Sequence, residues 1–159
     1  MPMTIRATVD PEVNRLEVRT AGDHLIRMAG GPPEGDGSAA GARETLLASL
    51  AGCTSMDVAS LLRKKRQRAA TYEVVISAES ADTPPRVFTA ITVEHRVTGE
   101  VEPEALRRSI ELSATRYCPV NAMLSKGTTV EHRYRLTDAA GEEHEAVVVI
   151  TGPQGPRAA

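Results

Sequence analysis

Apolar and polar residues alternate along several short runs of the chain, a pattern typical of strands with one buried face. Two such runs lie near the N-terminus, at residues 4–9 and 16–19. The others follow residue 70 and comprise residues 72–79, 87–97, 128–136 and 145–151. Turn-forming Asp, Gly and Pro residues separate the runs. The pattern predicts short strands in the N-terminal third and two pairs of strands later in the chain.

A different spacing governs residues 44–66, where apolar residues recur every three to four positions, as on one face of a helix. The middle of this stretch reads LLASLAGCTSM and is apolar or small all round, which is typical of a helix packed on most sides. A chain of 159 residues covers such a helix with difficulty. We therefore predict a dimer whose continuous core includes Leu46, Leu50, Val58 and Leu61.

A second helix is predicted over residues 103–117, beginning at Pro103, since proline is favoured at the first helical position. Pro119 pushes the preceding residue away from helical angles, so the chain should break at Cys118 and restart as a short helix over residues 120–124. Helices that interrupt groups of strands, instead of alternating singly with them, favour an α+β fold with antiparallel sheets.

The chain length and the stretches rich in glycine and proline suggest how the chain is organised. With 159 residues it has room for one domain, 1–159. Residues 29–41 read AGGPPEGDGSAAG and predict a flexible loop, and residues 152–159 predict a disordered tail.

Composition excludes several classes of function. Hydrophobic residues make up 41% and charged residues 25%, as in ordinary globular proteins. A net charge of −2 and an aromatic content of 3% disfavour nucleic-acid binding. The chain shows no apolar run of the ~18 residues that a membrane span needs and no signal-peptide pattern at its start. We expect no membrane partner and a cytoplasmic location.

The two cysteines, Cys53 and Cys118, are the main candidates for chemistry. Cys53 could be a buried, inert thiol, but Gly52 beside it costs a helix ~1 kcal/mol and suggests close approach by another backbone or a ligand. Cys118 would start a helix, where the positive dipole end favours the thiolate, or its place there could be incidental.

The cysteines stand in two stretches, ETLLASLAGCTSMD and RYCPVNA, that resemble the two cysteine motifs of the OsmC/Ohr family of thiol peroxidases. The resemblance covers about residues 24–137. It implies a homodimer with a swapped α+β fold, in which antiparallel sheets wrap around two long central helices and the site lies at the subunit interface.

By this resemblance Cys53 reacts with an organic hydroperoxide to give a sulfenic acid, Cys118 resolves it as a disulfide, and an external dithiol reductant restores both thiols. Glu44 and Arg27 would be the pair that activates the thiolate, with Arg43 and Arg116 as further candidates for the arginine. Glu44 lies nine residues before Cys53, whereas the family's carboxylate lies ten before, a helical offset of ~100°.

An alternative function remains open: a protein with little or no catalysis that binds a small apolar ligand at the dimer interface. In either case we expect an apolar pocket lined by Leu50, Met56 and Leu124. The four histidines show no metal-ligand spacing, and His95 and His132 fall on apolar strand faces, so we predict no metal. The glycine-rich loop lacks nucleotide-binding motifs, so we expect no cofactor.

Overall fold

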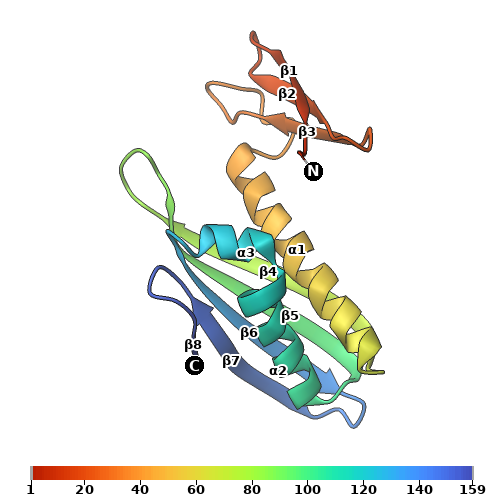
Figure 1. Ribbon diagram of the computed structural model, residues 1–159. Coiled ribbons are helices and arrows are strands. Elements are labelled where there is room, and N and C mark those ends of the chain that lie inside the picture. The colour runs from red at the N-terminus through yellow and green to blue at the C-terminus, as the bar shows by residue number, and fades with distance from the viewer. Residues whose placement is uncertain (1, 159) are drawn as a thin grey trace. The chain divides into compact units, whose positions relative to one another are not determined.

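The computed structural model describes residues 2–158, and contacts within the chain separate them into two compact units that join between Ala48 and Ser49. The elements are coloured along the chain in Figure 1. The expected single domain 1–159 and the swapped dimer stay predictions, since a single chain is described.

The N-terminal unit contains an antiparallel sheet of three strands, in the order β1-β2-β3. Its strands are β1 (Arg6–Asp10), β2 (Arg15–Arg19) and β3 (Leu25–Ala29). Val18 and Ala29 are buried, whereas most other positions of these strands are exposed. The unit also holds the first turns of helix α1 (Ala42–Lys64). Residues 30–41 form no helix or strand, as their glycines and prolines predict.

The C-terminal unit contains a five-stranded sheet with the order β4-β5-β6-β7-β8. Its long strands are β4 (Arg68–Ser80), β5 (Phe88–Glu100), β6 (Thr129–Asp138) and β7 (Glu143–Thr151). Helices α2 (Pro103–Leu112) and α3 (Pro119–Leu124) lie across one face of this sheet (Figure 1). The core joins that face to α1 and α2 through Val58, Leu62, Leu106, Ile110 and Leu136. The α+β class is therefore confirmed.

One strand pairing differs from the expected antiparallel sheets. Strands β5 and β6 run parallel, with Ile91 opposite Val130 and Val97 opposite Leu136. The segment between them contains α2 and α3, and a crossover of this length is what parallel neighbours require. Cys118 lies in this crossover, between α2 and α3, and is therefore placed on the face of the sheet that these helices cover.

The expected disordered tail at residues 152–159 is wrong for the described residues. Strand β8 (Arg157–Ala158) pairs antiparallel with β7, Val149 opposite Ala158 and Ile150 opposite Arg157. Gly155 adopts a left-handed φ of +84°, which lets the chain turn back toward β7. The glycines and prolines that suggested disorder therefore build a turn, and β8 covers backbone groups at the edge of β7.

Helix α1 buries one face, formed by Leu50, Thr54, Val58 and Leu62 at intervals of four residues. Of the predicted core positions, Leu50 and Val58 are buried, but Leu46 is 41% exposed and Leu61 is partly exposed in the single chain. By length and composition alone α1 could cross a membrane, a test that the core helix of a globular protein also passes.

Candidate functional site

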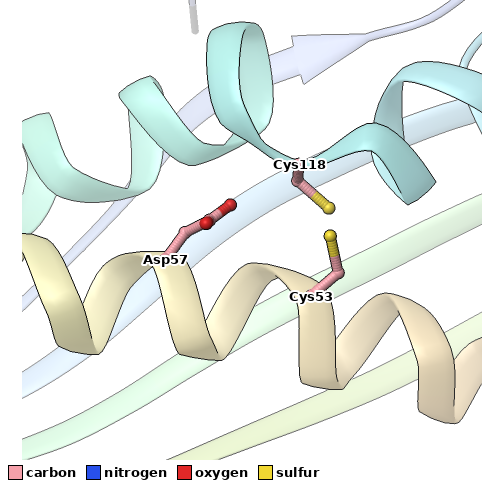
Figure 2. A group of neighbouring side chains, drawn as sticks. All are labelled: Cys53, Asp57 and Cys118. Carbon is pink, nitrogen blue, oxygen red and sulfur yellow. The ribbon is translucent and has the colours of Figure 1, made fainter. Parts of the chain in front are cut away.

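Two free thiols face each other within the C-terminal unit. Cys53 lies in the middle of α1, and Cys118 lies just before α3 (Figure 2). Their sulfur atoms and a carboxylate oxygen of Asp57 all lie within 4.8 Å of one another. Cys118 is 2% exposed, whereas Cys53 is partly exposed. The structure thus brings together two thiols that are 65 residues apart in the sequence.

The position of Cys118 follows from a break in the helical segment. After α2 the chain forms one π-helical turn, Ser113–Tyr117, and Cys118 then adopts an extended conformation with φ −75° and ψ 103°. Pro119 occupies the first position of α3 and disfavours helical angles at the residue before it. The predicted break at Cys118 is confirmed. The sulfur of Cys118 accepts a hydrogen bond from the backbone N–H of Asn121 at 3.3 Å.

The pKa of Cys118 is shifted in the direction opposite to the one expected for a stabilised thiolate. Burial, a hydrogen bond with Cys53 and the negative charge of Asp57 raise the pKa of Cys118 to about 12, although the Asn121 N–H acts in the opposite direction. The prediction that its place at the start of a helix lowers this pKa is wrong, because desolvation of the anion outweighs the helix end. Cys118 is therefore a protonated thiol at neutral pH.

Asp57 is a part of the site that the sequence analysis missed. It lies one helical turn after Cys53 on α1, and its Oδ2 accepts a hydrogen bond from the Ser113 hydroxyl at 3.0 Å. The hydroxyls of Thr54 and Ser113 are 3.2 Å apart, and both residues are fully buried. Spacing could have revealed Asp57, since residues four apart share one helix face.

A buried polar network lies beyond Cys118. The Asn121 side chain donates to the Ala114 carbonyl at 2.8 Å and lies 3.0 Å from Nε2 of His132. Tyr72 Oη lies 2.7 Å from Nδ1 of His95, and the two imidazoles stack with centroids 5.9 Å apart. Both histidines are fully buried, as expected of core residues.

Burial also sets the charge of these histidines. Desolvation lowers the pKa of His95 to about 3, with a smaller effect from His132, and that of His132 to about 4. Nε2 of His95 and Nδ1 of His132 have no hydrogen-bond partner among the described residues.

The proposed activating residues belong to the N-terminal unit and have partners there. Arg27 on β3 forms an ion pair with Glu17 at 3.0 Å, and both side chains are largely exposed. Glu44 accepts a hydrogen bond from the backbone N–H of Gly41 at 2.8 Å, so it caps the start of α1. In the C-terminal unit, the guanidinium of Arg116 lies 5.6 Å from the ring centre of Tyr117.

The single chain does not itself supply two features expected around Cys53. A Cβ added at Gly52 would meet no atom within 4 Å, so this glycine does not mark the close approach of another part of the chain. Leu50 is fully buried in the core and Met56 is 74% exposed, so the pocket expected at the dimer interface stays a prediction.

Two groups of described residues have the donor types and spacing of metal ligands. One is the site itself, with two cysteine sulfurs and Asp57, a set suited to zinc. The other comprises Asp138, Glu142 and His144 at the turn between β6 and β7. In the second group the Asp138 carboxylate already pairs with His144 at 2.9 Å.

The sequence matches the profile of the OsmC-like protein family over residues 35–133. Protein YhfA from Escherichia coli strain K12 is 36% identical to this chain over 121 residues, which cover 76% of the chain and 88% of YhfA. The family match over residues 35–133 spans both cysteine motifs and the helix that carries Cys53.

Solved structures agree with the family at the level of the fold. An OsmC like protein from Mycoplasma pneumoniae superposes with a TM-score of 0.71 at 15% identity, covering 86% of this chain and 97% of that one. An organic hydroperoxide resistance protein OsmC from Legionella pneumophila superposes with a TM-score of 0.61 at 13% identity, covering 83% and 95%. By its sequence and its fold, this chain belongs to the OsmC-like protein family.

Proposed function

We propose that the protein reduces organic hydroperoxides through Cys53 and Cys118. The observation that carries this proposal is the pair of free sulfurs facing each other within 4.8 Å (Figure 2). A disulfide needs an S–S distance of ~2.05 Å, so a small movement of either side chain would join them. The structure of the Legionella pneumophila relative, an organic hydroperoxide resistance protein, is in keeping with such a role.

Exposure assigns the order in which the cysteines react. Cys53 is partly exposed and Cys118 is 2% exposed, so a peroxide from solvent meets Cys53 first. The Cys53 thiolate attacks the terminal peroxide oxygen, an S–O bond forms and the O–O bond breaks. The departing alkoxide takes up a proton and leaves as an alcohol, and Cys53 becomes a sulfenic acid.

Cys118 completes the cycle in this proposal. Its sulfur attacks the sulfenic sulfur of Cys53, a disulfide forms and water leaves. An external dithiol then reduces the disulfide by thiol–disulfide exchange and is itself oxidised to a disulfide. The cytoplasm, where thiols are kept reduced, is the compartment that would supply such a reductant.

Apolar side chains beside both cysteines favour an organic substrate over hydrogen peroxide. Met56 lies three residues after Cys53, on a neighbouring position of the helix surface, and is 74% exposed. Tyr117 directly precedes Cys118 and is 47% exposed. An alkyl group could bury apolar area against such side chains, whereas hydrogen peroxide has none to bury.

A homodimer belongs to the same proposal. Leu46 in the N-terminal unit and Met56 and Met123 in the C-terminal unit are large apolar side chains left exposed by the single chain. A second copy could cover them, and the resemblance to the OsmC/Ohr family implies such a dimer. Light scattering at micromolar concentration should give twice the mass of the chain.

The test is to titrate the reduced protein with substoichiometric cumene hydroperoxide and count the remaining thiols. Two thiols should disappear for each hydroperoxide consumed, and hydrogen peroxide should react more slowly. Cys53→Ser should consume no hydroperoxide. Cys118→Ser should turn over once and, when excess hydroperoxide is then added, overoxidise, because no second thiol traps the sulfenic acid. Wild-type protein that keeps both thiols under excess hydroperoxide would refute the proposal.

A second candidate function is the binding of a small apolar ligand with little catalysis. The hydrogen bond from Gly41 to Glu44 favours it, since this carboxylate serves the start of α1. Arg27 and Glu44 are still proposed as the activating pair, on the family resemblance. Binding of an alkyl alcohol without any loss of thiols under hydroperoxide would select this second function.

A further inference from the structure

We infer that Asp57 is a catalytic residue of the resolving step: it takes the proton from the Cys118 thiol and delivers it to the hydroxide that leaves Cys53. The inference rests on the proposed function and extends it by one residue and one step. It arises from the position of the Asp57 carboxylate beside both sulfurs (Figure 2).

The geometry places one carboxylate oxygen within reach of both reacting atoms. This oxygen lies within 4.8 Å of the sulfur of Cys53 and within 4.8 Å of that of Cys118. A base must reach the proton directly or through one water molecule, and a separation of this size permits either after a small adjustment. Among the titratable groups, Cys53 and Asp57 are the ones that act on Cys118.

A buried chain of hydroxyl groups holds Asp57 as an acceptor. The single hydroxyl proton of Ser113 is donated to Asp57 Oδ2 at 3.0 Å. Thr54, whose hydroxyl lies 3.2 Å from that of Ser113, must then be the donor of their shared hydrogen bond. Both hydroxyls therefore point their protons toward the carboxylate. This arrangement orients the Asp57 carboxylate as a hydrogen-bond acceptor beside the two sulfurs.

The resolving step needs such a base because Cys118 holds its proton tightly. Burial raises the pKa of this thiol above its usual value. Cys118 is also 2% exposed, so bulk solvent has little access to its proton. Asp57 is the carboxylate that lies next to this thiol in the described part of the chain.

The step balances without any further reactant. The Cys118 S–H bond breaks and its proton goes to Asp57, while the sulfur forms an S–S bond to Cys53. The S–O bond of the Cys53 sulfenic acid breaks, and the hydroxide takes the proton from Asp57 to leave as water. The Cys118 sulfur is oxidised and the Cys53 sulfur is reduced, and Asp57 ends as the carboxylate it began as.

The experiment follows a single turnover with cumene hydroperoxide in rapid-mix samples of the full chain. Dimedone traps the sulfenic acid, and intact mass separates sulfenic acid, disulfide and sulfinic acid. Asp57→Asn should form the sulfenic acid as wild type does but convert it to disulfide about a hundredfold more slowly, the lower end of what a general base contributes. When a second equivalent of cumene hydroperoxide is added, sulfinic acid should accumulate in Asp57→Asn. Asp57→Glu should restore part of the rate.

Asp82→Asn is the matched control, because it removes the same charge from the exposed turn between β4 and β5 and should resolve at the wild-type rate. Wild-type resolution by Asp57→Asn would overturn the inference while leaving the proposed function intact. If wild type itself forms neither sulfenic acid nor disulfide, the proposed function fails instead.

A measurement on wild type keeps the inference testable if Asp57→Asn does not fold. With an internal base, the rate of disulfide formation should change by much less than tenfold per pH unit between about pH 6 and 9. A rate that rises about tenfold per unit over this range would mean that hydroxide from solvent removes the Cys118 proton, and would overturn the inference.

Discussion

Asn121 shows how one side chain ties the reactive segment to the sheet. It is fully buried, its backbone N–H donates to the sulfur of Cys118, and its amide donates to the carbonyl of Ala114. The amide nitrogen is thereby engaged as a donor, so the amide oxygen accepts from Nε2 of His132. This residue therefore links α3, the π-helical turn and β6.

Replacing Asn121 should cost stability more than an average substitution. Asn121→Ala leaves the Ala114 carbonyl and the His132 ring nitrogen without their buried partner and opens a small cavity. We expect the free energy of unfolding to fall by about 2–4 kcal/mol, measured by urea denaturation. Lys126→Ala, on the exposed turn after α3, should change it by no more than about 0.5 kcal/mol. Equal values for the two variants would contradict the network.

At the scale of elements, local sequence signals predict those helices, strands and breaks that are determined by residues close together in the sequence. Pro119 predicts the extended conformation of Cys118, because its ring restricts the residue before it. Alternation predicts β5, whose Val93, His95 and Val97 are buried. The helix over residues 44–66 is also found, as α1 with its bounds two residues earlier.

Other features of the fold and the site depend on partners distant in the sequence. The parallel pairing of β5 with β6 needs the path of a whole crossover, which hydrophobic spacing does not encode. The hydrogen bond of Ser113 to Asp57 joins residues 56 positions apart, so it forms only when the π-helical turn lies beside α1 in the folded chain. The helix-end rule gave the wrong pKa direction for Cys118 because burial depends on the same packing.

Gly52 offers a prediction about helix α1. Nothing lies within 4 Å of a Cβ added there, and Ala is favoured over Gly in a helix by about 0.8–1.0 kcal/mol. Gly52→Ala should therefore raise the free energy of unfolding by somewhat less than 1 kcal/mol, as measured by urea denaturation. If the variant is instead less stable or reacts more slowly with cumene hydroperoxide, a second subunit or the substrate must approach α1 at this position.

At the scale of the whole molecule, buried titratable groups limit stability from both sides of neutral pH. His95 and His132 are held neutral by burial, with pKa values of about 3 and about 4 against 6.5 for free histidine. Below pH 6.5 the unfolded chain binds protons that the folded chain does not, so stability falls as the pH falls. On the alkaline side, the raised pKa of Cys118 lets the folded chain keep a proton that the unfolded chain loses above pH 9, so stability falls as the pH rises.

The loss of stability on the acid side of neutral pH can be assigned to the two histidines. Carboxylates with lowered pKa values, such as Glu94 and Asp138, affect stability mainly below pH 4.5. Between about pH 7 and 5 the two histidines together should lower the free energy of unfolding by about 4 kcal/mol, which urea denaturation at each pH would measure. His95→Phe should remove about half of this dependence, while His24→Gln, at an exposed position of the N-terminal unit, should leave it unchanged. A wild-type stability that is flat from pH 7 to 5 would mean that His95 and His132 take up protons in the folded state, and that their buried environment opens to water.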